Sequence, residues 1–175
     1  IVVRPPLGSP ITASENTIIG NTVLYGATAG RLFANGRAGE RFAVRNSGAK
    51  VVIEGCGTNG CEYMTGGVAV ILGSVGANFG AGMTGGMAYI YDPEAQLDKL
   101  INRETLVTNG VTVDHWKDEL KSLLEDHLAE TRSAKAADIL RRWDEELANF
   151  VQVCPKEMLS RLPAPLSMET GQKTA

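Results

Sequence analysis

The tetrapeptide Met64-Thr65-Gly66-Gly67 returns 19 residues later as Met83-Thr84-Gly85-Gly86, and this repeat decides the fold. Glycines extend the pattern in both directions at steps of 9 or 10 residues. A fixed period near 20 residues indicates one supersecondary unit stacked on itself. Glycine tolerates left-handed backbone angles at little cost, so we predict that these glycines form the corners of successive coils. The predicted corner glycines are Gly20, Gly30, Gly39, Gly48, Gly57, Gly67, Gly76 and Gly86.

Short apolar runs follow several of the corner glycines and have the composition of strands. They are rich in β-branched and aromatic residues, as in 51–53, 68–72 and 87–91. Two runs per period predict a parallel β-helix with two strands and about 19 residues per coil. We therefore expect a mainly β fold, with a solenoid over residues 1–92.

Alignment of the runs on their leading glycines predicts which side chains face the inside of the coil. Because a strand sends alternate residues to opposite faces, the third and fifth residues are expected inside and the fourth outside. The fourth position is also apolar, so we expect another part of the chain to cover it. The residues expected inside are Val23, Tyr25, Phe42, Val44, Val51, Ile53, Val70, Leu72, Tyr89 and Tyr91, and those expected outside are Leu24, Ala43, Val52, Ile71 and Ile90.

Helical periodicity replaces the strand pattern after Asp92, and we predict a helical C-terminal extension over residues 93–175. Asp92-Pro93 is typical of a helix start and predicts a short helix to about Ile101, followed by a connector over 102–112. Asp114 and Ser133 are predicted to cap two amphipathic helices that form a hairpin on the solenoid. The predicted apolar faces are Trp116, Leu120, Leu123, Leu124 and Leu128 in the first helix, and Ala137, Leu140, Trp143, Leu147 and Phe150 in the second.

Composition limits the classes of partner and compartment. A net charge of −3 argues against nucleic acid or an anionic membrane as a partner. Three cysteines are too few for a disulfide framework and are typical of a reducing cytoplasm. Residues 63–91 carry no charge, but glycines interrupt them at half-coil spacing, which favours a covered solenoid wall over a membrane span. Because the chain begins with Ile1 rather than Met, we expect a fragment or a processed product.

Few sequence motifs could support chemistry, and each has a simpler structural interpretation. Residues 55–60 and 80–85 match G-x-G-x-x-G, but a strand rather than a helix is expected after each, so a dinucleotide site is disfavoured. Cys56 and Cys61 could supply half of a metal site, although buried packing is the simpler role. His115 and His127 lack metal-ligand spacing and are expected at helix-surface positions. We predict no catalytic, cofactor-binding or metal-binding residue in this chain.

Four segments resemble the C-terminal GXGXG domain of the glutamate synthase large subunit. They are Gly20–Gly30, Gly36–Gly48, Val52–Gly57 and Asn59–Gly67. The last, with its Asn-Gly-Cys-Glu-Tyr-Met-Thr-Gly-Gly block, is more specific than a general glycine pattern. The resemblance covers nearly the whole chain and implies a right-handed parallel β-helix, truncated here at its N-terminal side.

The resemblance also implies a parent enzyme that makes L-glutamate from L-glutamine and 2-oxoglutarate. In that family an amidotransferase domain releases ammonia, and a barrel domain holds FMN and a 3Fe-4S cluster, with NADPH electrons arriving through the small subunit. The β-helix domain is expected to hold these domains in register. No family catalytic motif maps onto this chain, and Cys56 and Cys61 are not expected to bind the cluster. The implied partners are the other domains of the large subunit and the small subunit.

An alternative is a stand-alone β-helix scaffold protein within a larger oxidoreductase. Such a protein would be similar to the separate solenoid subunit of formylmethanofuran dehydrogenases, or to a separate archaeal glutamate synthase subunit. In either case the isolated chain is expected to be catalytically inactive. A solenoid with an open first coil exposes unpaired backbone groups, so self-association through that coil or through the uncharged wall is also expected.

Overall fold

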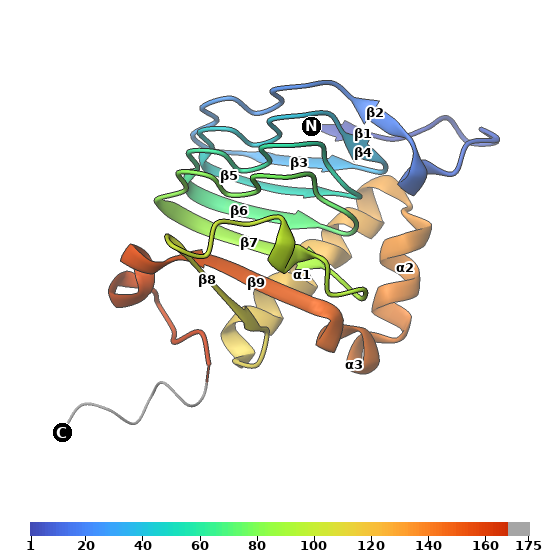
Figure 1. Ribbon diagram of the computed structural model, residues 1–175. Helices are drawn as coiled ribbons and strands as arrows, with labels where there is room; N and C mark the ends of the chain where they lie inside the picture. The colour runs from blue at the N-terminus through green and yellow to red at the C-terminus, as the bar shows by residue number, and fades with distance from the viewer. Residues whose placement is uncertain (168–175) are drawn as a thin grey trace.

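The computed structural model describes residues 1–167 and shows stacked coils with a layer of helices against one side (Figure 1). Five parallel strands form most of the main sheet, and their bounds are β1 (Val2–Val3), β3 (Arg31–Ala34), β5 (Ser47–Ile53), β6 (Thr65–Ile71) and β7 (Gly85–Tyr91). Paired residues on neighbouring strands from β3 to β7 lie 18 to 20 positions apart. The predicted mainly β solenoid of about 19 residues per coil, followed by helices, is confirmed.

The opposite side of each coil is built from tight turns, and the prediction of a second strand there is wrong. In residues 41–45 every second residue is left-handed, with φ of 57° at Arg41, 56° at Ala43 and 54° at Arg45. Hydrogen bonds between coils nevertheless persist: the Arg41 N–H donates to Thr58 O at 2.8 Å and the Ala43 N–H to Val23 O at 2.9 Å. Alternating handedness makes the backbone zigzag sharply while keeping these bonds. A short two-stranded sheet of β2 (Thr17–Ile19) and β4 (Arg37–Ala38) completes the first coils.

The predicted inside and outside assignment fails at three positions on this turn side, one of which is Leu24, expected outside but packed against the cluster inside the coils. Tyr25, expected inside, is 58% exposed, and Ala43, expected outside, is fully buried in the interior of the coils. The strict alternation of side chains belongs to extended strands. It does not hold where the backbone changes handedness from one residue to the next.

A bulge in the main sheet reverses another part of the assignment. Ser47 pairs with Gly66, 19 positions away, but Lys50 pairs with Val68, 18 positions away. A one-residue shift moves every following side chain to the other face of the sheet. The assignment is correct in β5 and wrong in β6 and β7. The side chains inside the coil are Val51, Ile53, Ala69, Ile71, Ala88 and Ile90, and those on the helix side are Val52, Val70, Leu72, Tyr89 and Tyr91.

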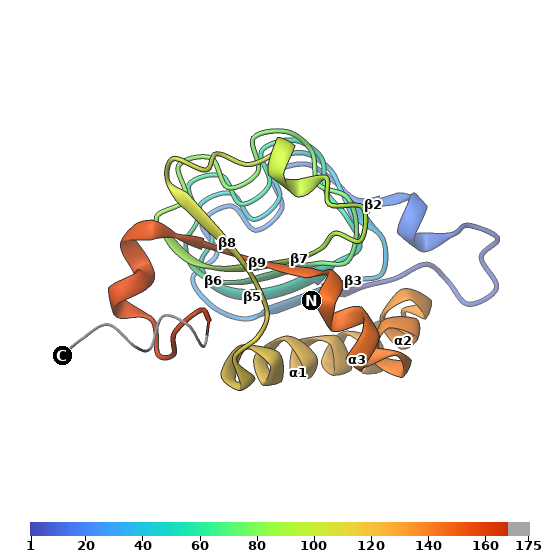
Figure 2. The same ribbon diagram turned by 60° about the horizontal axis from the view of Figure 1, so that its bottom comes forward.

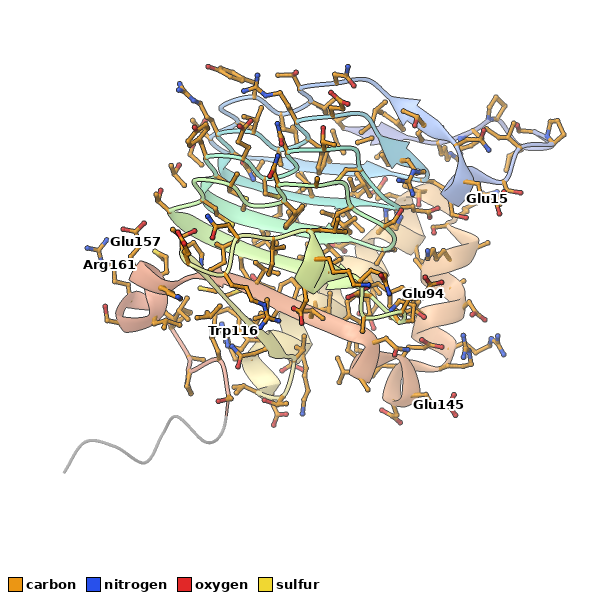
Figure 3. All side chains as sticks on the ribbon, viewed as in Figure 1. Glu15, Glu94, Trp116, Glu145, Glu157 and Arg161 are labelled. Atoms are coloured by element: carbon orange, nitrogen blue, oxygen red, sulfur yellow. The ribbon has the colours of Figure 1, made fainter. Side chains whose placement is uncertain are left out.

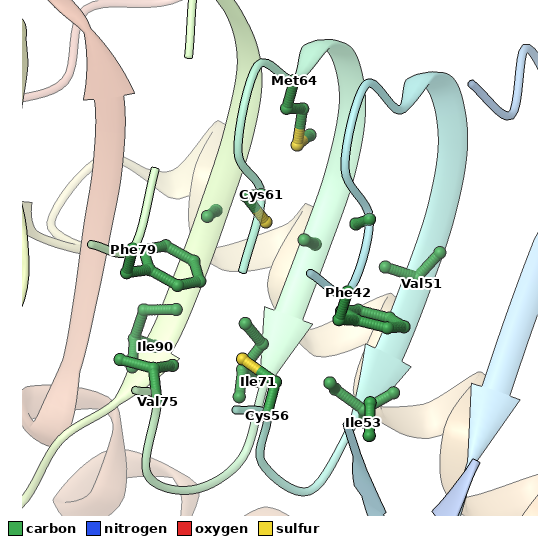
Figure 4. Close-up of a cluster of buried hydrophobic side chains, with 14 of the residues drawn as sticks. Phe42, Val51, Ile53, Cys56, Cys61, Met64, Ile71, Val75, Phe79 and Ile90 are labelled. Carbon is green, nitrogen blue, oxygen red and sulfur yellow. The ribbon is translucent and has the colours of Figure 1, made fainter. Parts of the chain in front are cut away.

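Two apolar clusters hold the layers together. The first fills the inside of the coils, where Phe42, Phe79 and Met64 lie beside the inner strand residues (Figure 4). The second lies between the sheet and the helices α1 (Asp114–Thr131), α2 (Ala134–Arg141) and α3 (Trp143–Glu146) (Figure 2). Both faces of the sheet are therefore buried, which explains why its strands are apolar at consecutive positions.

The segment after Asp92 differs from the prediction at its start. The Asp92 carboxylate accepts hydrogen bonds from the Gln96 and Leu97 N–H groups, but only a short 3-10 turn, η2 (Leu97–Lys99), follows. The predicted connector over 102–112 contains strand β8 (Leu106–Gly110). Helix α1 has Val113 as its N-cap, and Asp114 is its first residue.

The predicted second helix is shorter than expected. Ser133 does cap α2, its side chain accepting a hydrogen bond from the Ala136 N–H, but the buried residues are Ala136 and Ile139 rather than Ala137 and Leu140. Beyond α3 and the turn η3 (Leu147–Asn149), Phe150 begins strand β9 (Phe150–Pro155) instead of ending a helix. Strand β9 pairs antiparallel with β7 and β8, and the turn η4 (Lys156–Arg161) follows.

Charged side chains lie mainly on the outside. Glu15, Glu94, Glu145 and Arg161 point away from the body of the molecule, whereas Trp116 is buried (Figure 3). Within residues 1–167, none of the helices is both long and apolar enough to cross a membrane. Residues 168–175 of the predicted extension lie outside the described residues.

Candidate functional site

A buried polar cluster joins the solenoid to the helices, and we call Glu54, His127, Thr131 and Ser133 the Glu54 cluster. Glu54 follows the last residue of β5, His127 and Thr131 belong to the last turns of α1, and Ser133 caps α2. Each of the four residues is at most 1% exposed. The Ser133 hydroxyl donates a short hydrogen bond to the Glu54 carboxylate, and the Thr131 hydroxyl donates to the His127 carbonyl at 2.6 Å.

The surroundings of Glu54 compensate for the burial of its carboxylate. A buried charge is costly unless it is hydrogen-bonded or paired. Besides the Ser133 hydroxyl, the carboxylate lies close to the N-terminus of α2, where the helix dipole favours negative charge. His127 Nε2 lies 3.7 Å from Glu54 Oε1. The cluster thus fixes the junction between α1 and α2 against the end of β5.

The Glu54 cluster contains the residue types of a hydrolytic triad but not its geometry. A triad needs a serine hydroxyl bonded to the histidine that accepts its proton. Here the Ser133 hydroxyl bonds the carboxylate, and neither ring nitrogen of His127 has a hydrogen-bond partner among residues 1–167. Ser133 is also fully buried. The arrangement is that of a structural junction.

Further polar contacts attach α1 to several coils. Glu119 in α1 accepts hydrogen bonds from Lys50 Nζ of β5 and from the Tyr89 hydroxyl of β7, both at 3.1 Å. Burial, and next the charge of Glu119, raise the pKa of Tyr89 well above its usual range, so its hydroxyl stays protonated and donates. Arg31 of β3 pairs with Asp126 at 2.5 Å. Helix α1 is therefore attached to three different strands of the main sheet.

The predicted corner glycines differ in what a side chain would meet at their positions: some have a left-handed φ, and at others a Cβ would collide with a neighbouring coil. Gly67 and Gly86 have φ of +83°, and Gly30 has φ of +95°. A Cβ on Gly48 would collide with the Thr28 carbonyl oxygen, although Gly48 is not left-handed. A Cβ on Gly20 would meet no atom within 4 Å. Close approach of neighbouring atoms accounts for the others, since a Cβ would meet Asn21 at Gly39, Glu40 at Gly57 and Thr58 at Gly76.

The three cysteines are buried thiols in two separate places. Cys56 and Cys61 lie inside the coils, and Cys154 belongs to the cluster on the helix side of the sheet. Burial raises the pKa of Cys56 to about 12 and that of Cys154 to about 11, and it raises the pKa of Cys61 well above its usual range. An iron–sulfur cluster needs several neighbouring thiolates. Because these thiols are protonated and lie in two separate places, they do not fit an iron–sulfur cluster.

The other motifs singled out in the sequence also lie in structural positions. The first G-x-G-x-x-G match lies in the turn side of a coil and is followed by β6, and the second ends at Gly85, where β7 begins, so a strand rather than a helix follows each. His115 is exposed near the start of α1, as predicted, but His127 is fully buried, so its predicted surface position is wrong. Within residues 1–167, no group of three or more His, Cys, Asp or Glu side chains could hold a metal ion.

Sequence reasoning did not identify the Glu54 cluster. A signal for its acidic member was available, because Glu54 is the sole charged residue between Lys50 and Glu62 in an otherwise apolar and glycine-rich stretch. Its partners come from 73 to 79 positions further along the chain, and nothing local indicates that pairing.

Comparison with known proteins identifies relatives of the whole chain. The family model described as "GXGXG motif" matches residues 1–156. The chain is 62% identical over 168 residues to the glutamate synthase [NADPH] large chain of Azospirillum brasilense, covering 96% of this chain and 11% of that protein. It is 52% identical over 175 residues to ferredoxin-dependent glutamate synthase 2 of Synechocystis sp., covering 99% of this chain and 11% of that protein.

A plant relative shows the same relation. Ferredoxin-dependent glutamate synthase 1 of Arabidopsis thaliana is 52% identical over 155 residues, which are 89% of this chain and 10% of that protein. The chain thus spans about a tenth of the length of the curated relatives that it matches. With its repeated glycines, stacked coils and a family match over residues 1–156, the chain belongs to the GXGXG motif family.

Proposed function

We propose that this chain is the scaffolding domain of a glutamate synthase, whose whole protein makes L-glutamate from L-glutamine and 2-oxoglutarate with reducing electrons. In this proposal the domain holds the amidotransferase and FMN-containing domains in register and carries out no chemical step itself. FMN, a 3Fe-4S cluster and NADPH supplied through a small subunit belong to the other parts of the enzyme. The observation that carries the proposal is the 62% identity to a glutamate synthase large chain over 96% of this chain.

The geometry supports a structural role. The polar groups that the fold brings together are used in attaching helices to coils: Glu54 bonds the cap of α2, and Glu119 bonds two strands. The buried thiols are protonated and inaccessible, so they offer neither nucleophile nor cluster ligand. A rigid solenoid with both sheet faces filled provides a stiff support between moving or reacting domains.

The proposal is tested in the full-length protein that carries this chain, through the coupling of its partial reactions. Gly67→Val should distort the solenoid corner while leaving the other domains folded. Glutamine hydrolysis alone, and glutamate formation from added ammonia, should both persist, while glutamine-dependent glutamate formation falls several-fold. Gly20→Ala is the matched control, since a Cβ there meets no atom within 4 Å. Unchanged coupling in a variant with a demonstrably distorted solenoid, or turnover by the isolated 175-residue chain, would contradict the proposal.

We also propose that the isolated chain self-associates through its first coil. Ile1 is 75% exposed and Val2 44% exposed, and β1 pairs with β3 along one edge. The helices cover the main-sheet part of the uncharged wall, where Val70, Leu72 and Tyr89 are fully buried, whereas Tyr63 on the turn side is 50% exposed. Sedimentation velocity over a concentration series should show association that Val2→Lys reduces; a monomer at every concentration would contradict it.

A further inference from the structure

Strand β8 is the last strand of the main sheet, and among the described residues it has a paired neighbour on one side only. The strand order places it beyond β9, at the opposite end of the stack from β1 (Figure 1). Both apolar clusters reach this strand, because Leu106 lies in the cluster inside the coils and Val107 packs against the cluster on the helix side. The sheet therefore ends at β8 with apolar packing on both of its faces.

The pairing with β9 identifies which backbone groups of β8 point away from the sheet. The Lys156 N–H donates to the Thr105 carbonyl at 2.9 Å, so the backbone of Thr105 faces β9. Because successive residues of an antiparallel strand face alternate sides, every second residue after Thr105 also faces β9. Thr108 and Gly110 fall between these residues and present their N–H and carbonyl groups to the outer edge. Within residues 1–167, none of these outward groups has a hydrogen-bond partner.

This outer edge lacks the features that usually prevent strand addition. Soluble proteins protect a free edge with lysines or other charges, with prolines, with bulges or with a covering segment. The sequence of β8, Leu-Val-Thr-Asn-Gly, contains neither a charged residue nor a proline, and its register with β9 runs without a shift from Leu106 to Gly110. At the other end of the stack, by contrast, Arg4, Pro5 and Pro6 directly follow β1. The edge of β8 is therefore suited to pairing with one more strand.

We propose that an extended segment from outside these 175 residues, in the same polypeptide, adds to the outer edge of β8. The inference rests on the proposed function, in which this chain is one domain of a glutamate synthase. The chain covers 11% of the length of a curated relative, so most of such a polypeptide would lie outside the domain. Thr108 and Gly110 offer few hydrogen bonds, which would hold a separate copy of this chain only weakly. A segment tethered to the domain acts at an effective concentration in the millimolar range, so the same few bonds suffice.

The position of β8 also indicates the composition of the added segment. A strand sends alternate side chains to the two faces of its sheet. On one face they would lie beside Leu106 and on the other beside Val107, where the two apolar clusters end. Gly110 has no side chain, which leaves space at its end of the edge. We therefore expect an uncharged segment as long as the five residues of β8, with apolar side chains on both faces.

Hydrogen exchange resolved to single residues tests the pairing in the full-length protein that carries this chain. The amides of Thr108 and Gly110 should exchange at least about tenfold more slowly than unprotected amides, because each would be hydrogen-bonded in a strand. The amides of Val107 and Asn109, which face β9, should be protected in any case and serve as the internal reference. Free exchange at Thr108 and Gly110 would overturn the proposal and leave the scaffolding function untouched. Protection that is lost on dilution would also overturn it, because that result would indicate a second copy of the chain.

Thr108→Pro separates strand pairing from simple coverage by another domain. Proline removes the outward N–H, and an edge strand tolerates proline where that N–H is not bonded within its own sheet. Protection of the Gly110 amide should therefore fall at least about tenfold, while Val107 and Asn109 stay protected. Thr108→Val, which keeps the N–H and the preference for a strand, is the matched control and should keep the protection of Gly110.

Gly110→Pro, read at the Thr108 amide, repeats the test from the other end of the strand. The Thr108 amide should lose its protection in this variant for the same reason. Protection that survives both proline substitutions would show that another domain merely covers the edge, and it would overturn the proposal.

Discussion

At the scale of single residues, the fold holds several non-glycine residues in the left-handed backbone region, and this conformation reduces stability. Arg41, Ala43 and Arg45 all have positive φ, and the turn side of other coils repeats the arrangement at Asn59, Cys61 and Tyr63. Non-glycine residues adopt this region at a cost of order 1 kcal/mol each. The buried side chains between them offset that cost, since Phe42 and Val44 are fully enclosed.

Substitution at Gly67 should show how much a corner depends on glycine. Gly67 has φ of +83°, and a Cβ there would collide with the Ala49 carbonyl oxygen, which belongs to rigid backbone. Gly67→Val should therefore reduce the free energy of unfolding by more than about 2 kcal/mol. Gly20→Ala, with free space around the new methyl group, should change it by less than about 0.5 kcal/mol. Chemical denaturation compares the two, and equal effects would show that the corner tolerates a side chain.

The corners were predictable from the sequence because glycine recurs there at a fixed spacing. The left-handed conformation of the turn side was not predictable. Its left-handed positions hold arginine, alanine, cysteine and tyrosine as well as glycine, as Arg45, Ala43 and Cys61 show. Glycine and asparagine, as at Asn59, are typical of a positive φ, but the other residue types are not. Inter-coil hydrogen bonds and the packing of intervening side chains select that conformation, and both are properties of the stack rather than of the local sequence.

At the scale of elements, the positions of the solenoid strands were predictable from the sequence. The predicted direction of their side chains, inside or outside the coil, was wrong in β6 and β7. Their apolar residues stand at consecutive positions because both sheet faces are buried. The sequence therefore shows no alternation that would tell side chains inside the coil from those on the helix side. The bulge between Ser47 and Lys50 then shifts β6 relative to β5 by one residue. Strand β9 was missed because Leu147 and Phe150 continue the helical spacing, while pairing with β7 and β8 makes the segment from Phe150 extended.

The junction of α2 with β5 should depend strongly on Ser133 and Glu54. Ser133→Ala removes the helix cap, worth about 1 kcal/mol, and leaves the buried Glu54 carboxylate without its hydroxyl donor, worth about 1–3 kcal/mol more. A total loss of about 2–4 kcal/mol is expected. Adding Glu54→Gln should cost less in the Ser133→Ala background than in the parent, because the two side chains act as one unit. Denaturation of the four proteins gives this coupling, and strictly additive losses would contradict the contact.

For the whole molecule, residues far apart in sequence close one end of the stack. Tyr91 at the end of β7 donates a hydrogen bond to Glu146 of α3 at 2.5 Å, and Asn149 Nδ2 donates to the same carboxylate oxygen at 2.8 Å. Arg142 also pairs with Glu146. The sequence predicted that helices would follow the solenoid, but this closure depends on the hydrogen bond between Tyr91 and Glu146, 55 positions apart, which no local pattern reveals.

Stability should depend on pH through this closure. The Tyr91 hydrogen bond, above all, holds the pKa of Glu146 below its ordinary value of 4.5, so the carboxylate contributes stability above that value and loses it as pH falls through the lower folded pKa. Burial, and next Glu146, raise the pKa of Tyr91 from 10 to about 12, so its contribution is lost as pH rises across that interval.

Removing the Tyr91 hydroxyl tests both the loss of stability at low pH and the loss at high pH. Tyr91→Phe should lower the denaturation midpoint at neutral pH, and the difference from the parent protein should shrink as the pH falls below 4.5 and again as it rises from 10 to about 12. Tyr25→Phe, an exposed tyrosine on the turn side, is the matched control. A difference between Tyr91→Phe and the parent that stays constant at every pH would show that packing alone, and not the titrating pair, is responsible.

The attachment of α1 to several strands restricts how this domain can evolve by duplication. Repeats of 19 residues invite the gain or loss of a whole coil, which changes the stack by about 4.8 Å. Yet α1 is a single helix of 18 residues bonded to β3 through Arg31, to β5 through Lys50 and to β7 through Tyr89. An inserted coil would separate these anchor points by about three residues of helical rise, so Asp126 and Glu119 could no longer both reach their partners. We therefore expect coil number and helix length to change together: relatives with an extra coil inserted under α1 should carry a compensating insertion in the helix.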